Sequence, residues 1–136
     1  MNFLFYQFYN DILSYYLTAN LYCALLKQTA SAVGITSQLF SSIQATYEID
    51  AVTGVYVTDG GAISTTGRSI INDKLILPEI YWQDDDNILD DVYYAVVYDK
   101  TTSKLISKLD FQGEKTSDNG WFRISFGSNG FIKFTI

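Results

Sequence analysis

The sequence predicts a mainly β fold: a single antiparallel β-sandwich, Ig-like or jelly-roll-like, with a helix at its N-terminus. Three features point to it, namely the length of the chain, its aromatic content and the alternation of side chains in its last third. With 136 residues, the chain fits one domain spanning residues 1–136 and can bury enough surface for one core. Its 11 tyrosines and 9 phenylalanines favour strands, because their rings lie well on a pleated, half-buried surface.

The N-terminal helix is predicted over about residues 5–17, where apolar side chains recur at helical spacing. This pattern breaks at residues 18–20, and the pattern of residues 21–28 is typical of a strand. Thr36 or Ser37 is then a candidate N-cap for a short helix, because a hydroxyl there accepts a hydrogen bond from an N–H of the first turn. The first part of the chain is therefore expected to give a helical arm, a strand and a second helix.

Strand signals dominate the middle of the chain. Residues 46–49 and 54–58 are short runs of β-branched and aromatic residues. Residues 59–61 (Asp-Gly-Gly) predict a turn, since glycine accepts a positive φ without steric cost. Residues 75–82 are a further strand candidate, with Pro78 inside it. Because proline cannot donate a hydrogen bond to a neighbouring strand, this strand is expected to be bulged or at an edge.

The last third of the chain has the clearest strand pattern. Residues 92–98 and 104–111 are expected to form one hairpin, and residues 121–126 and 131–136 a second one. The second hairpin would turn at residues 127–130, which contain the favoured Asn-Gly dipeptide. Period-two alternation indicates a sheet with one face in the core. The expected inner face consists of Phe122, Ile124, Phe126, Ile132 and Phe134, whereas Trp121, Arg123 and Ser125 point the other way.

The strand at residues 92–98 differs because both of its faces are apolar. Such a strand either sits centrally in a sandwich or has one face covered by another subunit. A chain this small has little material with which to cover both faces. The pattern therefore favours assembly with other subunits.

The charge balance argues against nucleic acid and membranes as partners. A net charge of −6 is repelled by the phosphate backbone and by anionic lipid surfaces. A secretory signal begins with a basic region, whereas the first Lys or Arg of this chain is Lys27. Polar residues also interrupt the apolar N-terminal run before it reaches the length of a spanning helix. We expect no signal peptide, no secretion and no transmembrane segment.

The residue types that usually carry catalysis are scarce. Histidine is absent, and Cys23 is the one cysteine, which excludes Ser-His and Cys-His catalysis and the usual zinc ligand sets. Cys23 is expected to be a buried core residue rather than a nucleophile. Glycine loops of the Walker or dinucleotide-binding type are also absent. The sequence therefore predicts no enzymatic activity, no catalytic residue and no cofactor.

A run of carboxylates at Asp84, Asp85 and Asp86 is the densest group of potential ligands. Clustered carboxylates suit Ca²⁺, which takes about six to eight oxygen ligands. An EF-hand loop beginning at Asp84 would need glycine at its sixth position and glutamate at its twelfth, where the chain has Leu89 and Ala95. We therefore expect no structural metal and a solvated acidic loop. An irregular cation site is the alternative.

Tyr81 and Trp82 directly precede this acidic run and form a candidate ligand patch with Asp84, Asp85 and Asp86. Aromatic rings stack on the apolar faces of sugars, while carboxylates accept hydrogen bonds from sugar hydroxyls. The competing interpretation is that Tyr81 or Trp82 packs in the core at the end of a strand.

The aromatic N-terminal segment is a candidate subunit interface. A helix that is apolar over so much of its circumference cannot bury every ring against one sheet, and an exposed patch of this size usually marks an interface. The competing interpretation is that this helix closes an open end of the sandwich. The candidate interface residues are Phe3, Phe5, Tyr6, Phe8 and Tyr9, together with Tyr93.

Several segments carry a resemblance to a known family. They are residues 93–100 (YYAVVYDK), Leu105-Ile106, residues 109–113 (LDFQG), Asn119-Gly120 and residues 128–132 (SNGFI). In this order they resemble small structural proteins encoded by tailed bacteriophages and prophages. The resemblance covers nearly the full length, more loosely upstream, and rests mostly on fold-determining residues. Pro78 and the acidic run at residues 84–86 depart from the family pattern.

The resemblance implies a non-enzymatic virion protein that assembles in the host cytoplasm. Its expected role is a capsid decoration (cement) protein that binds the head shell. Its expected partners are other virion proteins, above all the major capsid protein, and further copies of itself. A tail, connector or fibre-attachment protein is the first alternative. From another class, the alternative is a carbohydrate-binding module that contacts the host surface.

Overall fold

A computed structural model of the chain describes residues 12–36, 38–72, 74–83, 86–117 and 120–126, and the backbone of residues 132 and 133. A helical segment at residues 12–18 comes first. The elements that follow are β1 (Leu21–Leu26), the 3-10 helix η1 (Gln28–Ala32), α2 (Phe40–Tyr47), β2 (Gly61–Ala62), β3 (Ser69–Ile71), β4 (Lys74–Ile76), β5 (Ile80–Gln83), β6 (Val92–Asp99), β7 (Leu105–Lys115), β8 (Trp121–Ile124) and β9 (Ile132–Lys133).

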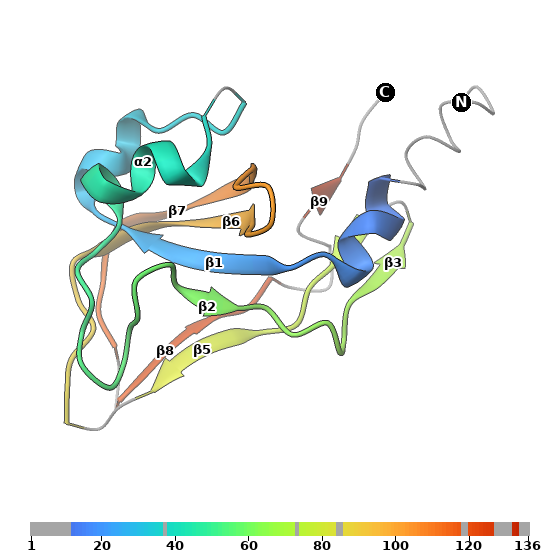
Figure 1. The fold of residues 1–136 in the computed structure, drawn as a ribbon. Helices are drawn as coiled ribbons and strands as arrows, with labels where there is room; N and C mark the ends of the chain where they lie inside the picture. The colour runs from blue at the N-terminus through green and yellow to red at the C-terminus, as the bar shows by residue number, and fades with distance from the viewer. Residues whose placement is uncertain are drawn as a thin grey trace.

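The strands of the described residues form three antiparallel sheets. The largest has the order β2-β1-β6-β7, a smaller one has the order β3-β4-β9, and β5 pairs with β8 alone. In Figure 1 the β5–β8 pair lies below the large sheet, while α2 and the chain around it lie above. The fold is therefore mainly β and antiparallel with a helical segment near its N-terminus, which confirms the predicted fold class.

Strand β6 is buried on both faces, and this chain itself supplies both covers. Ala95 and Val97 face the β5–β8 pair, in a core cluster with Trp82 and Phe122. On the other face, Val96 packs in a second cluster with side chains of η1 and α2. Of the two predicted alternatives, the central position within the chain's own layers is the one observed, because two short helices cover the second face. The burial of β6 therefore does not require another subunit.

The β6–β7 hairpin is confirmed. It pairs Val97 with Ser107 and Ala95 with Leu109, and its turn closes through a hydrogen bond from the Ser103 N–H to the Asp99 carbonyl. The register shifts between Val92 and Tyr94. This irregularity turns Val92 into the same cluster as Ala95 and Val97, although simple alternation assigns it to the opposite face.

The second predicted hairpin is wrong. Strand β8 pairs with β5, whereas Ile132 and Lys133, which form β9, pair with β4 instead. The predicted inward orientation of Phe122 and Ile124 is confirmed, since both are buried, and Phe126 packs partly against the same cluster. In β5 the buried residues Ile80 and Trp82 also alternate with exposed ones. The pattern of β5 is therefore as compatible with pairing to β8 as the pattern of residues 131–136. Residues 127–131 and Phe134 lie outside the described part of the chain, as does the side chain of Ile132.

Pro78 divides the predicted strand at residues 75–82 into β4 and β5, which belong to different sheets. The strand predicted at residues 46–49 is instead the end of α2 and an isolated bridge at Glu48, and residues 54–58 contribute only the bridge from Tyr56 to Val52. The turn at residues 59–61 is confirmed, with a φ of 87° at Gly60. Short β-branched runs thus become strands only where a neighbouring strand is available.

The helices η1 and α2 form a helical layer, and polar side chains of β7 and of the β6–β7 turn hold this layer against the large sheet. The Lys108 ammonium donates to the carbonyl oxygens of Ala30 at 2.7 Å and Val33 at 3.1 Å, at the end of η1. Helix α2 is capped by Ser103 of the β6–β7 turn, whose Oγ accepts from the Ser41 N–H at 2.9 Å. Leu39 occupies the N-cap position, so the predicted cap at Thr36 or Ser37 is wrong, although Ser37 itself lies outside the described residues.

Candidate functional site

The pairing of β5 with β8 creates an aromatic and cationic surface on the outer face of the molecule. Tyr81 lies opposite Arg123, and Gln83 lies opposite Trp121. Successive residues of a strand point to opposite faces. Because the intervening residues are buried in the core, these four side chains lie on the outward face.

Three of these side chains contact one another, and we call them the aromatic ladder: Tyr81, Trp121 and Arg123. The ring centroids of Tyr81 and Trp121 are 4.9 Å apart, with an interplanar angle of 51°. The Arg123 guanidinium carbon lies 4.4 Å from the Trp121 centroid, a cation–π contact. Tyr81 is 55 % exposed, so much of its side chain is accessible to a partner.

Arg123 carries a positive charge and forms no ion pair with another described residue. Its guanidinium lies against the Trp121 ring. An arginine in this state suits a carboxylate, which accepts two parallel hydrogen bonds from the planar fork.

Trp82 does not belong to this surface, and the predicted patch of Tyr81 with Trp82 is wrong. Trp82 is 7 % exposed and packs against Tyr56 and Phe122, with centroids 5.9 and 6.1 Å away. Adjacent strand residues point in opposite directions, so the two neighbours in sequence cannot share a face. Sequence reasoning did place Trp121 and Arg123 on one face, but it lacked the partner strand that brings Tyr81 to them.

The acidic part of the predicted patch is only partly described. Asp84 and Asp85 lie outside the described residues, and Asp86 is exposed. Within the described ranges, no group of three or more Asp, Glu or Cys side chains is arranged to hold a metal ion. A cation site that includes Asp84 or Asp85 stays a prediction.

The predicted interface residues Phe3, Phe5, Tyr6, Phe8 and Tyr9 also lie outside the described residues. The segment that follows them is packed against the body of the protein. Leu13 is 1 % exposed and belongs to the same core cluster as β5 and β8, while Tyr16 and Leu17 pack against it. The helical segment at residues 12–18 is therefore packed in the core on this side. Whether the preceding rings form an interface stays a prediction.

Tyr93, the remaining predicted interface residue, lies partly exposed on β6. Its hydroxyl is 3.4 Å from the Glu114 carboxylate, to which it donates a hydrogen bond. Desolvation, followed by the negative charges of Glu114 and Asp91, raises the pKa of Tyr93. Tyr93 is thus accessible at the surface but has an intramolecular partner on β7.

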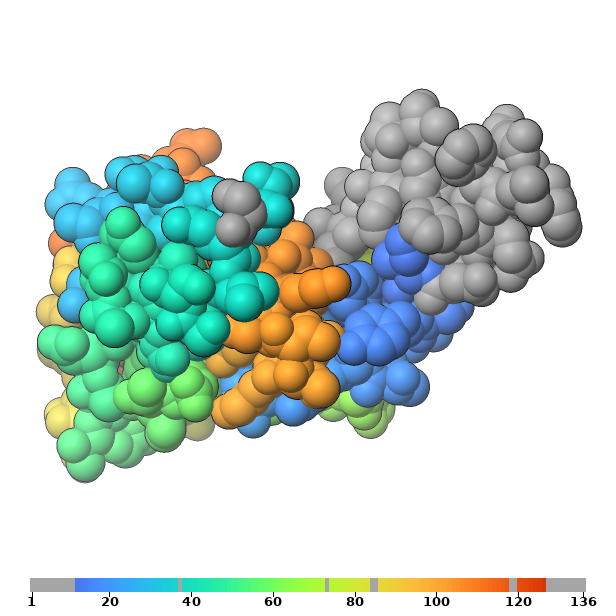
Figure 2. All heavy atoms as spheres, turned by 45° about the horizontal axis from the view of Figure 1, so that its top comes forward, coloured from blue at the N-terminus to red at the C-terminus, as the bar shows by residue number. Residues whose placement is uncertain are grey.

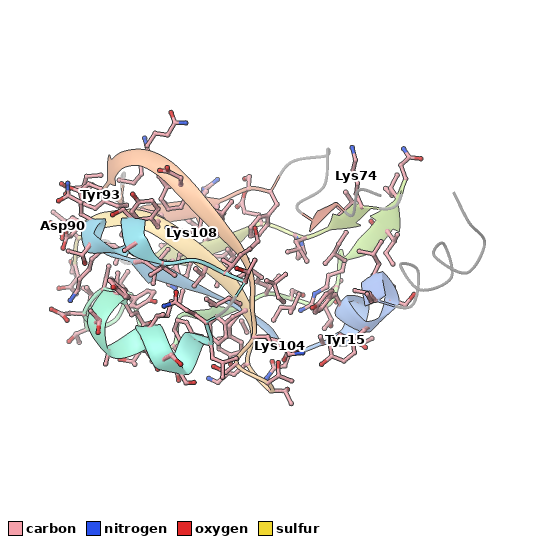
Figure 3. All side chains as sticks on the ribbon, turned by 90° about the horizontal axis from the view of Figure 1, so that it is seen from above. Tyr15, Lys74, Asp90, Tyr93, Lys104 and Lys108 are labelled. Atoms are coloured by element: carbon pink, nitrogen blue, oxygen red, sulfur yellow. The ribbon has the colours of Figure 1, made fainter. Side chains whose placement is uncertain are left out.

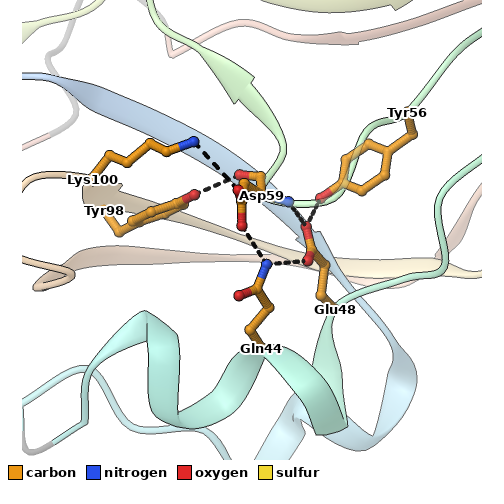
Figure 4. A network of polar contacts seen from close by, with 6 residues as sticks. All are labelled: Gln44, Glu48, Tyr56, Asp59, Tyr98 and Lys100. Atoms are coloured by element: carbon orange, nitrogen blue, oxygen red, sulfur yellow. Dashed lines mark hydrogen bonds and ion pairs between the residues drawn. The ribbon is translucent and has the colours of Figure 1, made fainter.

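A buried carboxylate organises a polar network between α2, the loop before β2 and the large sheet (Figure 4). Glu48 is 6 % exposed. It accepts hydrogen bonds from the Tyr56 hydroxyl at 2.6 Å, the Asp59 N–H at 2.9 Å and the Gln44 amide at 2.9 Å. The Tyr56 hydroxyl in turn accepts from the Leu25 N–H of β1 at 3.0 Å. The Glu48 network therefore ties the loop to both the helix and the sheet.

The same network extends through Asp59 to the end of β6. The Gln44 amide also donates to the Asp59 carboxylate, and the Tyr98 hydroxyl donates to the Asp59 carbonyl at 2.6 Å. Lys100 pairs with the Asp59 carboxylate at 3.4 Å. Burial is the main factor that raises the pKa of Glu48, and the Asp59 charge adds to it, while the hydrogen bonds act in the opposite direction. Because every buried side-chain polar atom of the described residues has a partner, the network is a structural element.

The predicted core position of Cys23 is confirmed. Its side chain is fully buried, and this burial raises the pKa of the thiol to about 12. The nucleophilic thiolate is therefore scarce at neutral pH. Among the described helices, none is both long enough and apolar enough to cross a lipid bilayer.

Comparison with known proteins returns no match to a family model, to a curated protein or to a solved structure. The functional proposal therefore depends on the residues of this chain.

Proposed function

We propose that this protein is a non-enzymatic structural subunit of a tailed-phage particle, in the role of a capsid decoration protein that binds the assembled head shell. The resemblance of residues 93–100 and 109–113 to small virion proteins supports the class. The observation that carries the proposal is the aromatic ladder, which places Tyr81, Trp121 and Arg123 side by side on the outward face of the β5–β8 pair.

The composition of the ladder suits a protein–protein contact. Tyr, Trp and Arg are the residue types most enriched among those that dominate binding energy at interfaces. The contacts within Tyr81, Trp121 and Arg123 hold these side chains in place before a partner arrives, which lowers the conformational entropy lost on binding. The surface is therefore already arranged for docking.

The overall charge suits a protein that must stay soluble until it assembles. At a net charge of −6, free copies repel one another. Arg123 is a local exception on β8, so it can direct an acidic surface of the shell to the ladder. Mutual repulsion between copies and attraction to the shell would together favour binding over self-aggregation.

The experiment is a measurement of copy number in purified particles, combined with variants of the ladder. Quantitative mass spectrometry should find hundreds of copies if the protein decorates the shell. Arg123→Glu and Tyr81→Ser should fold normally but lose most of their incorporation. Lys115→Glu makes the same charge change at an exposed site on β7 and should incorporate normally.

Other copy numbers decide between the alternatives. About six or twelve copies per particle would replace the shell role by a tail, connector or fibre-attachment role, because those positions follow the symmetry of the portal and tail. Absence of the protein from particles would reject the virion proposal altogether. Normal incorporation of both ladder variants would reject the ladder as the docking surface.

A carbohydrate-binding module is the second candidate, and the exposed ring of Tyr81 beside Trp121 favours it. With Trp82 in the core, any sugar platform would consist of Tyr81 and Trp121. Saturable binding on a glycan array that Trp121→Ala abolishes, with no incorporation of the protein into particles, would support this module over the virion subunit.

A further inference from the structure

A cavity of about 320 Å³ lies between the helical segment at residues 12–18 and the β6–β7 turn. In Figure 2 the turn separates this helical segment from α2. Figure 3 shows Tyr15 and Lys104 close to each other at this site. The cavity is lined by Ile12, Tyr15, Tyr16, Asp99, Thr102 and Lys104.

The carboxylate of Asp99 is the unusual group in this cavity, because its residue is 2 % exposed. One oxygen accepts a hydrogen bond from the Tyr15 hydroxyl at 2.7 Å, and the other accepts from the Thr101 N–H at 2.9 Å. No cation of the described residues lies within ion-pair distance of it. A carboxylate withdrawn from water without a positive partner is costly, so a cation at this position would be stabilised.

The aromatic walls favour the same kind of ligand. The rings of Tyr15 and Tyr16 meet edge to face, with centroids 5.3 Å apart and an interplanar angle of 70°. Tyr15 is 51 % exposed, so part of its ring is open to a partner. The face of an aromatic ring attracts a cation, and a guanidinium or ammonium on a long apolar stem also buries its stem against such rings.

Lys104 is exposed and lines the same cavity, but it forms no ion pair with Asp99. Its ammonium competes with an incoming cation and repels it. An anionic ligand would gain from Lys104 but would approach the buried Asp99 carboxylate, which is fixed in place by two hydrogen bonds. Since Lys104 can move away on its flexible stem and Asp99 cannot, the cavity selects cations.

We propose that this cavity binds an arginine or lysine side chain of a neighbouring protein in the particle. This inference rests on the proposed function, since it names a second contact through which the subunit is held. The ladder offers a cation to an acidic partner surface, whereas the Asp99 cavity accepts a cation. The two contacts therefore fit different parts of the neighbouring surface.

The test uses the isotopically labelled full-length protein and two small probes, N-acetyl-arginine amide and its neutral isostere N-acetyl-citrulline amide. Binding is followed through the NMR signals of the Thr101 and Ser103 amides. We expect saturable shifts with the arginine probe and none with the citrulline probe. Asp99→Asn should weaken binding by at least about fivefold, because it removes the charge and keeps the shape.

Lys104 provides a variant that does not endanger the fold, because its side chain is exposed. Lys104→Ala should tighten binding of the arginine probe about two- to fivefold by removing the competing charge. Equal shifts with both probes, unchanged affinity in Asp99→Asn, or weaker binding in Lys104→Ala would each overturn the proposal. Saturable binding of N-acetyl-glutamate amide that Lys104→Ala abolishes would show an anion site instead.

The experiments distinguish a failure of the cavity proposal from a failure of the proposed virion function. If the protein decorates particles but the arginine probe does not bind, the cavity proposal fails and the virion role stands. If the probe binds but particles lack the protein, the virion role fails. The cavity is then a cation site whose partner belongs to another setting.

Discussion

The two faces of strand β6 are buried by different means. On the inner face, Ala95 and Val97 pack against the β5–β8 pair in a cluster that consists of apolar side chains from several strands. On the opposite face, which we call the helical face, Val96 and Tyr98 pack against two short helices. Tyr98 stacks on Phe40 at a centroid distance of 3.9 Å. These side chains are buried on both faces of β6, but the contacts that support the two faces differ.

The inner face depends on the fit of side chains between sheets, whereas the helical face depends on polar anchors. Lys108, Ser103 and Glu48 each bind backbone groups or side chains of the helical layer or its loop. Short helices such as η1 and α2 are too short to be stable alone. The comparison therefore indicates that loss of a core ring should unfold the protein as a whole, whereas loss of an anchor should loosen one layer.

The largest effect is expected from Phe122→Ala on the inner face. Phe122 is 6 % exposed and contacts Trp82 and Phe111, with ring centroids 6.1 and 6.2 Å away. Truncation leaves a cavity where neighbouring rings cannot close in, so the free energy of unfolding should fall by about 3–5 kcal/mol. Urea denaturation of the purified variant measures this loss.

Tyr81→Ala is the matched control, since it truncates an aromatic ring on the opposite face of the same strand pair. It should cost about 1 kcal/mol or less, because only cross-strand contacts at the surface are lost. Equal losses of unfolding free energy in the two variants would contradict the assignment of Phe122 to the core and of Tyr81 to the surface.

A smaller and more local effect is expected from Lys108→Met on the helical face. Methionine keeps the length of the side chain but cannot donate to the carbonyl oxygens of η1. The free energy of unfolding should fall by about 1–2 kcal/mol. Hydrogen exchange should accelerate at η1 and leave the β1 and β6 amides nearly unchanged. Lys115→Met, at an exposed position of the same strand, is the control and should change neither quantity.

The smallest effect is expected from Glu48→Gln, and it depends on pH. A carboxyl group with a raised pKa in the folded state contributes most to stability below its unfolded pKa of about 4.3. That contribution is lost as the pH rises through the folded pKa. The glutamine variant does not titrate, so its stability relative to the wild type should increase as the pH rises above about 4 and level off above the raised folded pKa. Urea denaturation across this range tests it, and a constant or decreasing difference would contradict the raised pKa of Glu48.

Local pattern was sufficient to predict strands that pair with their sequence neighbour. The hairpin of β6 and β7 follows from two apolar runs separated by a short polar turn. Alternation also identified the buried side of β8, because Phe122 and Ile124 recur with period two. What alternation cannot supply is the partner strand, since the sequences of β5 and of residues 131–136 both alternate apolar and polar residues, and β5 is the strand that pairs with β8.

The candidate site was only half predictable for the same reason. Trp121 and Arg123 were assigned to one face, but Tyr81 joins them through long-range pairing and was grouped with Trp82 instead. The cap of α2 could not be predicted either, because Ser103 lies far from this helix in sequence and no local pattern links the two. Asp99 was not selected at all, since a single carboxylate at a strand end is ordinary until the helical segment covers it with Tyr15.

Gly60 has a consequence for how this fold can change over evolution. A Cβ at this position would lie 2.0 Å from the Cys23 carbonyl oxygen and 2.8 Å from the Ala24 Cα, and its φ of 87° already disfavours other residues. No side chain can be accommodated without displacing β1, the strand that joins the two clusters. Gly34 has no atom within 4 Å of such a Cβ and is free to vary. Diverging relatives should therefore replace surface and even core residues long before they replace Gly60, which makes this glycine a marker for recognising them.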